Sequence, residues 1–362
     1  VLRRTTPGVA IVTTGAFAEH FDRVLDLGDW RDFPARRAES AARGMLRGFG
    51  LGMYVENDGS TPTEFAEVRA TGDGRVVVAV GTQDFGMGHD TVFSQIAAAT
   101  LEVPFDRIDV LFGDTDRVAR GAGSAGSRSA RLGGGAVVVG VRKLIQDGRA
   151  LAAEMLEAAA VDVTYAAGRF TVAGTDRGVD LFQVAGFAEA TGGRLAAPVD
   201  FATAGGVHAS GCHACEVLVN PDDGTLRIER HVIVADVGRA INPLIVHGQM
   251  HGGAAQGIGQ ALMEHVRFEA DTGQPLTGSF MEYVLPRADD LPAMTVELNE
   301  RPEADNPLGV KGAGENATTG APAAVMNAVR DALRSTGDAG VDMPAMPERI
   351  WRALRRAKPG IE

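Results

Sequence analysis

Hydrophobic residues recur along this chain with two spacings, one typical of amphipathic helices and one typical of strands. The helical spacing predicts helices at residues 16–30, 35–43, 90–101, 129–156, 181–190, 243–265, 321–335 and 347–356. Alternation and short apolar runs predict strands at residues 46–55, 64–71, 75–80, 108–112, 161–165, 170–172, 215–219, 226–235, 266–268, 282–285 and 294–298. A strand, a glycine-rich loop and a helix follow one another at 80–101, 108–156 and 294–335. This order predicts a layered α+β fold, whose converging helix N-termini favour anions.

Glycines interrupt two of these predicted elements at positions where a side chain is normally favoured. Gly48, Gly50 and Gly52 lie in the first long strand, and two more glycines lie in the helical sequence 256–260, which reads Gln-Gly-Ile-Gly-Gln. Each glycine costs a helix about 1 kcal/mol relative to alanine. We therefore expect a ligand or another element to approach the backbone closely at both places. The amide of Gln256 suits the edge of a heterocycle, and close helix packing is the alternative.

The composition of the chain argues against some classes of binding partner. The 362 residues carry 35 Lys and Arg against 47 Asp and Glu, a formal net charge of −12. A broad basic surface for nucleic acid or anionic lipid is therefore not expected. No apolar run approaches the roughly 20 residues of a membrane span, and no secretory leader is visible. We expect a cytoplasmic protein without a membrane span.

The two cysteines, Cys212 and Cys215, form a C-x-x-C pattern that can be redox-active or half of a zinc site. Two cysteines cannot supply a four-cysteine cluster. The pair falls in a strand-like segment, where positions three apart point to opposite faces, so we expect two small buried residues. No set of His, Cys and Asp has zinc or iron spacing, so we expect no metal held mainly by side chains of this chain.

A glycine turn at residues 310–322 carries a single acid. Gly312 and Gly314 allow the backbone to turn tightly and to approach a ligand, and Glu315 follows just before a helical run. A carboxylate fixed by such a turn suits a general base. The alternative is that Glu315 only complements the dipole of the following helix.

A literal G-x-G-x-x-G lies at residues 121–126. This pattern is typical of dinucleotide-binding Rossmann folds when it directly follows a strand, but here eight residues separate it from the predicted strand. Ser127, Arg128 and Ser129 follow it. Two hydroxyls and a guanidinium at a helix start suit a phosphate or pyrophosphate. Ordinary N-capping by either serine is the alternative.

The loop at 81–89 is also glycine-rich, and it ends on His89 at the start of a predicted helix. A histidine in this place can act as a base or as a metal ligand. A solitary histidine at a helix start is more often a cap or a solvated residue.

Seven stretches resemble, in the same order, the molybdopterin-binding subunit of the xanthine dehydrogenase or molybdenum hydroxylase family. They are residues 81–89, 113–116, 123–129, 236–243, 256–260, 278–283 and 311–323. The nearest likeness is to bacterial carbon-monoxide-dehydrogenase-like large chains. Because family large chains are considerably longer, the resemblance implies a C-terminal half. It implies two similar cofactor-binding subdomains of mixed sheets covered by helices, at 46–205 and 206–362, after a helical lead-in at 1–45 from a missing N-terminal half.

The resemblance implies roles for residues in several loops. Glu315 takes the position of the family's general base, which removes a proton from the oxygen nucleophile. The implied contacts to the pterin cofactor are Gly86, Met87, Gly88, His89, Gly126, Ser127, Arg128, Ser129, Gln256, Lys311, Gly312 and Gly314. The family usually has glutamine where this chain has Met87, which cannot give the same amide hydrogen bonds. The backbone N–H groups of Gly86 and Gly88 are then expected to serve in its place.

The resemblance also implies the cofactor, the reaction and the partners. The metal is molybdenum, held by the dithiolene of molybdopterin in its cytosine dinucleotide form. With two cysteines this chain cannot hold the family's two iron–sulfur clusters, so 2Fe-2S and FAD are expected on separate iron–sulfur and FAD subunits. The missing half of the large subunit is a further expected partner. The expected reaction hydroxylates an electron-poor carbon of an aldehyde, a purine or another N-heterocycle with oxygen from water, or oxidises carbon monoxide.

Two other functions remain open from the sequence. The first is a truncated, non-catalytic module for molybdopterin binding or assembly. The second is an NAD-dependent dehydrogenase that uses the glycines at 121–126.

Overall fold

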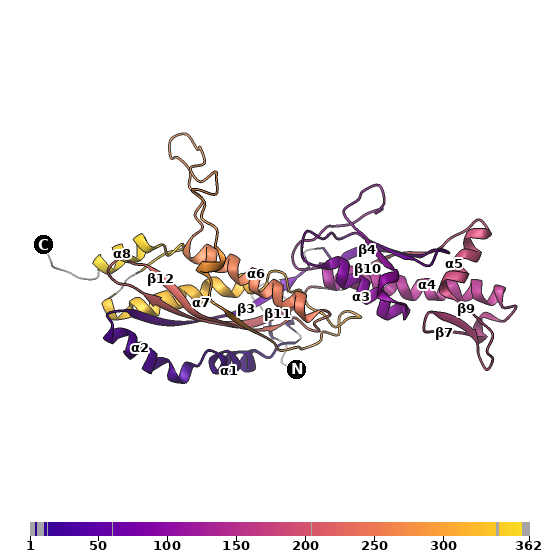
Figure 1. Ribbon diagram of the computed structural model, residues 1–362, viewed down its shortest axis with the longest axis horizontal. Coiled ribbons are helices and arrows are strands. Elements are labelled where there is room, and N and C mark those ends of the chain that lie inside the picture. The colour runs from indigo at the N-terminus through magenta and orange to yellow at the C-terminus, as the bar shows by residue number, and fades with distance from the viewer. Residues whose placement is uncertain are drawn as a thin grey trace.

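Two four-stranded mixed sheets lie end to end along a long molecule (Figure 1). The computed structural model describes residues 4–5, 11–12, 14–59, 61–203, 205–337 and 340–356. A short additional pair, β1 (Arg4–Thr5) and β2 (Ile11–Val12), lies near the N-terminus. No helix of the described residues is long and apolar enough to cross a membrane.

The first sheet has the strand order β10-β4-β5-β6. Its strands are β4 (Thr63–Ala70), β5 (Val76–Val80), β6 (Ile108–Leu111) and β10 (Leu195–Ala202). β4 and β5 form a hairpin, and helix α3 (His89–Leu101) carries the chain to β6, which pairs in parallel with β5. Helix α4 (Gly134–Met155) begins with a π-helical turn at Ser129–Gly133 and packs on the same core.

A small outer layer lies beyond the first sheet, at the right of Figure 1. It is formed by a three-stranded antiparallel sheet and one helix, which are β7 (Val163–Ala166), β8 (Arg169–Val172), β9 (Gly178–Asp180) and α5 (Leu181–Ala190). Its apolar side chains join the core of the first sheet, with Phe170 and Leu181 fully buried.

The second sheet has the strand order β13-β12-β11-β3. Its strands are β3 (Leu46–Asp58), β11 (Val207–Val219), β12 (Leu226–Asp236) and β13 (Met294–Leu298). β11 and β12 form a hairpin, and helix α6 (Pro243–Leu262) carries the chain to β13, which pairs in parallel with β12. Helices α7 (Asn316–Leu333) and α8 (Pro347–Arg356) cover one face, and α1 (Phe17–Leu27) and α2 (Phe33–Ala42) cover the other.

Both sheets therefore share one pairing pattern: an outer strand, an antiparallel hairpin, and a parallel edge strand reached through a crossover helix. This confirms the predicted α+β class with mixed sheets covered by helices. The strand pairing moves the expected boundary between the two subdomains, because β3 pairs with β11 along its whole length and belongs to the second sheet. The lead-in helices α1 and α2 also pack on that second sheet.

Most predicted helices and strands are present, and the errors are two predicted strands that are absent, two shifted helix ends, and strands that were missed. The predicted strands at 266–268 and 282–285 are absent from this described part of the chain, which shows only an isolated bridge between Phe268 and Pro275. α6 ends at Leu262, short of the predicted 265, and α7 begins five residues earlier than predicted and includes Pro322. β10 and the first half of β11 were not predicted.

The two cysteines lie where the strand period predicted. Cys212 packs with Val24 and Phe49 on the face covered by α1 and α2, whereas Cys215 packs on the opposite face with Val325 of α7. Both thiols are free and buried, and burial raises the pKa of the Cys212 thiol to about 12. They are apolar core residues in this fold.

The glycines of β3 lie directly against the backbone of α7. A Cβ atom on Gly50 would lie 2.1 Å from the Ala328 nitrogen and 2.2 Å from the Ala324 carbonyl oxygen. Gly257 of α6 has the same kind of neighbour, because a Cβ atom there would lie 2.7 Å from the Ala321 Cβ atom. The expected close approach is confirmed in both places, and the approaching element is α7.

Candidate active site

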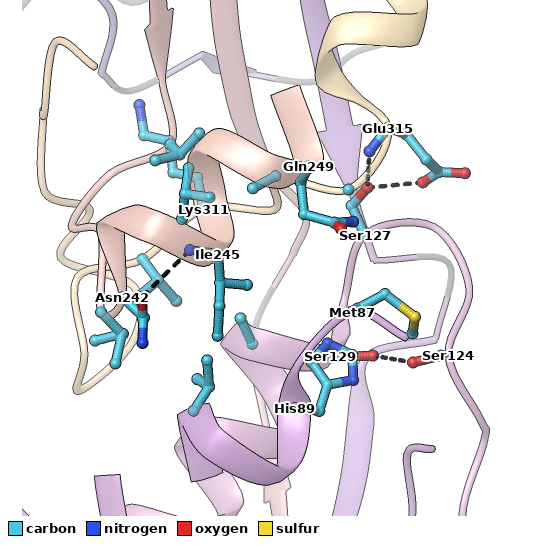
Figure 2. Close-up of a pocket in the computed structure, with 18 of the residues that line it drawn as sticks. Met87, His89, Ser124, Ser127, Ser129, Asn242, Ile245, Gln249, Lys311 and Glu315 are labelled. Carbon is cyan, nitrogen blue, oxygen red and sulfur yellow. Dashed lines mark hydrogen bonds between the residues drawn. The ribbon is translucent and has the colours of Figure 1, made fainter. Parts of the chain in front are cut away.

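A cavity of about 300 Å³ lies at the junction of the two sheets, and residues from both sides line it (Figure 2). The loop at 85–89 and residues 124–130 come from the first side, and the start of α6 and the turn at 310–315 come from the second. Eight of the predicted site residues line this cavity: Met87, His89, Gly126, Ser127, Ser129, Lys311, Gly314 and Glu315. The other five, which are Gly86, Gly88, Arg128, Gln256 and Gly312, are not among its lining residues.

Buried polar groups hold the glycine turn at 310–315 in place. The Gly312 N–H donates to Asp58 Oδ2 at 2.8 Å, and the side chain of Asn316 donates to the Gly312 carbonyl oxygen at 2.9 Å. Lys311 is fully buried, and its Nζ atom lies 2.5 Å from Asp236 Oδ2 at the end of β12. Asp58 is itself paired with Arg131, with 3.1 Å between Nε and Oδ1. These bonds hold the turn in one position relative to both sheets.

Glu315 stands at the N-cap position of α7, but its side chain does not cap the helix. Its Oε2 atom instead accepts a hydrogen bond of 2.7 Å from the Ser127 hydroxyl, and its backbone N–H donates to the same hydroxyl at 3.2 Å (Figure 2). Ser127 is therefore not the simple N-cap that the sequence also allowed. The carboxylate is exposed and faces the cavity, so a proton donor bound in the cavity can come within hydrogen-bonding reach of it.

Ser127 has a backbone conformation that is uncommon for a residue with a side chain. Its φ is +54°, and the preceding Gly126 has a φ of +58°. A non-glycine residue in the left-handed region costs about 1–3 kcal/mol and persists where the surroundings fix it. Here the strained backbone brings the hydroxyl between the start of α7 and the end of β3.

The loop before α3 is organised by Asp84. Its carboxylate accepts backbone N–H groups from Gly86 at 2.8 Å, Met87 at 2.7 Å and His89 at 2.7 Å. Partial burial alone would raise the pKa of Asp84, but these backbone hydrogen bonds lower it below its ordinary value. The expectation that the Gly86 N–H is open to a ligand is therefore wrong, because Asp84 already occupies it.

His89 lines the cavity with restricted orientation. Its Nδ1 atom lies 3.1 Å from the Gln83 carbonyl oxygen, and its ring stacks on Phe93. Behind it, the hydroxyls of Thr82, Ser124 and Ser129 form a cluster with separations of 2.6 to 2.9 Å. This cluster presents polar groups at the start of α4, although no side chain caps that helix.

Arg128 and Gln256 point elsewhere in this structure. Arg128 is buried, pairs with Glu64, and donates to the Thr63 carbonyl oxygen at 2.5 Å, so its guanidinium holds the loop to β4. Gln256 is exposed on α6 and accepts from Thr318 at 3.2 Å. The glycines at 121–126 also have a packing role, because a Cβ atom on Gly121 would lie 2.0 Å from the Gly81 carbonyl oxygen.

Several lining residues were not predicted from the sequence. They are Arg239 in the turn before α6, Asn242 at its N-cap, and Ile245 and Gln249 in its first turns. Asn242 caps this helix by accepting from the Ile245 N–H at 3.2 Å, so the Asn-Pro sequence was a usable signal. Among the described residues, no carboxylate pairs with the exposed guanidinium of Arg239. The same part of the chain contains no cluster of three or more His, Cys, Asp or Glu side chains arranged to hold a metal ion.

We expect Gly312→Ala to destabilise the protein by about 1–3 kcal/mol, because overpacking at a fixed position has this cost. The added Cβ atom would lie 2.5 Å from both the Cβ atom and the carbonyl oxygen of Ser127. Gly314→Ala is the matched control, since its nearest neighbour is 3.7 Å away at Gln249 Nε2. The free energies of unfolding from urea titrations measure both effects. Equal stability of the two variants would contradict this account of the turn.

Comparisons with known proteins agree with this geometry. The sequence profile of the molybdopterin cofactor-binding domain matches residues 23–292. Subunit gamma of the 6-hydroxypseudooxynicotine dehydrogenase complex of Paenarthrobacter nicotinovorans is 35% identical over 360 residues, covering 96% of this chain and 45% of that protein. The carbon monoxide dehydrogenase large chain of Hydrogenophaga pseudoflava is 30% identical, covering 94% and 45% respectively. Quinoline 2-oxidoreductase from Pseudomonas putida 86 superposes with a TM-score of 0.87 at 32% identity, covering 98% and 47%.

These matches define a molybdopterin-binding protein. The chain belongs to the xanthine dehydrogenase family of molybdenum hydroxylases and is a molybdopterin cofactor-binding part of such an oxidoreductase. It spans about half the length of the curated relatives it matches.

Proposed function

We propose that this chain is the C-terminal, cofactor-binding half of a molybdenum hydroxylase large subunit, with Glu315 as the general base. The reaction is the hydroxylation of an electron-poor carbon with oxygen from water, or the oxidation of carbon monoxide. One observation carries the proposal: a carboxylate faces the cavity from a turn whose backbone is fixed by Asp58 and Lys311. A base placed on such a rigid support keeps its direction toward the reacting oxygen.

The donor groups of the cavity fit a molybdopterin dinucleotide. Arg239 offers a guanidinium to phosphate oxygens, and the Gln249 amide offers hydrogen bonds to the pterin edges. Asn242 accepts from the Ile245 N–H and donates to Gln95, so one hydrogen of its amide is left for the cofactor. The hydroxyl cluster of Ser124 and Ser129 adds polar oxygens to the cavity wall at the start of α4, with the Ser124 hydrogen donated to the Gln83 carbonyl oxygen at 2.8 Å. When bound, the cofactor supplies the metal centre that accepts electrons. Glu315 accepts the proton released in the reaction, and Ser127 holds the carboxylate in place.

An exposed apolar segment supports the proposal of a second half. Residues 264–293 project from the body between α6 and β13 (Figure 1). Phe280 is 84% exposed and Met281 is 87% exposed, and Val266 and Phe268 are also open to solvent. Large apolar side chains gathered on one projecting segment are typical of an interface. Because the curated relatives are about twice as long as this chain, we propose that the other half of the large subunit covers this segment.

Purification of the complex that contains this chain tests the proposal. We expect about one molybdenum per chain, release of a cytidine nucleotide on denaturation, and co-purifying subunits that carry 2Fe-2S clusters and FAD. Bound NAD without molybdenum would overturn the proposal in favour of a dehydrogenase. Bound molybdopterin in a complex that turns over none of the aldehyde, N-heterocycle or carbon monoxide probes would favour a non-catalytic module.

A further inference from the structure

Glu56, near the end of β3, lies beside the candidate base, and no role described above uses it. The Ser127 hydroxyl oxygen lies 3.1 Å from Glu56 Oε1 and 2.7 Å from Glu315 Oε2. The same oxygen accepts the Glu315 backbone N–H at 3.2 Å. One serine therefore joins two carboxyl groups that come from elements far apart in the sequence.

The number of hydrogens on this serine restricts the charge of the pair. A hydroxyl has one hydrogen to donate and two lone pairs to accept with. One lone pair is used by the Glu315 N–H, and the hydrogen can reach only one carboxylate. If Glu56 and Glu315 were both ionised, one of them would face a hydroxyl lone pair at hydrogen-bonding distance. The three contacts are satisfied together when one carboxyl carries a proton and donates it to Ser127.

We propose that Glu56 is a positioning residue that carries this proton and donates it to Ser127, so that the serine hydrogen is directed at the Glu315 carboxylate. The hydrogen bonds then run in one direction, from Glu56 through Ser127 to Glu315. The Glu315 carboxyl then accepts the serine hydrogen on the cavity side, and a hydrogen bond to a charged acceptor is stronger than one between neutral groups.

The surroundings of the two carboxyls agree with this assignment. Glu315 is exposed, whereas Glu56 is half-buried and its Oε2 atom has no hydrogen-bond partner among the described residues. Burial raises the pKa of Glu56 to about 7, and the charge of Glu315 and a hydrogen bond between the two carboxyls add to this rise. A hydrogen bond donated by Ser127 to Glu56 opposes the rise, whereas one donated by Glu56 to Ser127 favours the protonated form. The half-buried Glu56 is therefore the carboxyl of this pair that is assigned the proton.

Among the residues that the structure describes, no Lys, Arg or His forms an ion pair with Glu56. Asp58 on the same strand adds to the rise of its pKa, but the Asp58 charge is matched by Arg131. Tyr54, also on β3, is neutral because burial raises its pKa. His208 on the neighbouring β11 interacts electrostatically with Asp58, and burial lowers the pKa of its ring.

The hydrogen bonds from Glu56 to Ser127 and Glu315 depend on pH because they need the Glu56 proton. The folded protein holds the Glu56 proton to a higher pH than an ordinary glutamate does. The directed arrangement is therefore complete below about pH 7 and is lost as the pH rises through that value, when Glu56 ionises.

Infrared difference spectroscopy of the purified complex, titrated without substrate, tests this inference. We expect the carbonyl band of a protonated carboxyl to disappear with a midpoint near pH 7. Glu56→Gln should lack the band, and Glu67→Gln, a half-buried glutamate on β4, should keep it. Ser127→Ala should keep a protonated carboxyl but move its midpoint, because one hydrogen bond is lost.

Crystal structures of two Glu56 variants distinguish the effect of the donated hydrogen from the effect of side-chain shape. In crystal structures, Glu56→Gln should keep Ser127 directed at Glu315, because its amide still donates, whereas Glu56→Leu should release Ser127. A band that persists in Glu56→Gln, or a wild-type protein without a carboxyl that titrates near pH 7, would overturn the inference. The inference uses the proposed function only for the role of Glu315. Because the band is read without turnover, an inactive complex would count against that function alone.

Discussion

Glu315→Gln is expected to reduce turnover of the assembled enzyme by about 10²–10⁴-fold, the usual contribution of a general base. Glutamine has the size of glutamate and can still bond to Ser127, so the 2.7 Å contact at the start of α7 has a close substitute. It cannot accept a proton at neutral pH. Steady-state kinetics of the complex, with kcat and kcat/KM measured separately, provides the test.

The same preparations supply the control for Glu315→Gln. Molybdenum content and subunit composition should match those of the wild type, because the variant removes a proton acceptor and leaves the cavity shape intact. Glu348→Gln, on the exposed side of α8, is the matched substitution without a site contact and should leave turnover unchanged. Wild-type turnover in Glu315→Gln would refute the assignment of the base.

Lys311→Met is expected to lower the free energy of unfolding by about 3–5 kcal/mol, because removing one partner leaves the other charge buried and unpaired. The side chains of Lys311 and Asp236 are both 0% exposed, and their charged atoms are 2.5 Å apart. Asp236 also accepts the Gly238 N–H at 2.9 Å, so the unpaired charge would disturb two segments of the cavity wall. Urea titrations at constant m-value measure the change.

Two further variants make the Lys311 experiment specific. Adding Asp236→Asn to Lys311→Met should recover part of the loss, because a neutral amide then replaces the unpaired carboxylate. Arg352→Met breaks an exposed pair with Glu348 on α8, which should cost no more than about 1 kcal/mol. A loss of that small size in Lys311→Met would show that the buried pair does not fix the turn.

The sequence identified several residues that line the cavity, but it did not identify the distant residues that contact them. The turn with Gly312 and Gly314 and the serine loop were predicted from glycine spacing, and the structure brings Ser127 and Glu315 together. Glu56 gave no signal, since a glutamate in an alternating strand reads as a solvent-facing residue. Its importance comes from a serine 71 residues away in the chain.

Arg128, unlike Glu56, gave a clear signal in the sequence, but the structure gives it a different partner. Next to two serines at a helix start it reads as a phosphate ligand, but Glu64 and the Thr63 carbonyl oxygen take its guanidinium. Those partners lie on a strand whose position depends on the whole first sheet. A sequence pattern identifies a cation but not the tertiary partner that neutralises it.

The fold errors have a related cause. Residues 207–214 form half of β11, and every residue of that strand is buried on both faces, so no alternation marks it. The segment at 266–285 has strand-like composition, but the described structure places no sheet beside it. Strand propensity describes how well a residue fits a sheet, and the sheet itself is set by the rest of the chain.

The glycines of β3 fix the distance between α7 and the sheet, which packing through side chains would leave adjustable. Where two elements are separated by side chains, exchanging one apolar residue for another adjusts their spacing by fractions of an ångström. Here the backbones of β3 and α7 meet at Gly48, Gly50 and Gly52, so no substitution of one apolar side chain for another can change the spacing at these positions. The depth of α7 on the sheet, and with it the height of Glu315 above the cavity floor, is a fixed dimension that drift in the surrounding core residues leaves unchanged.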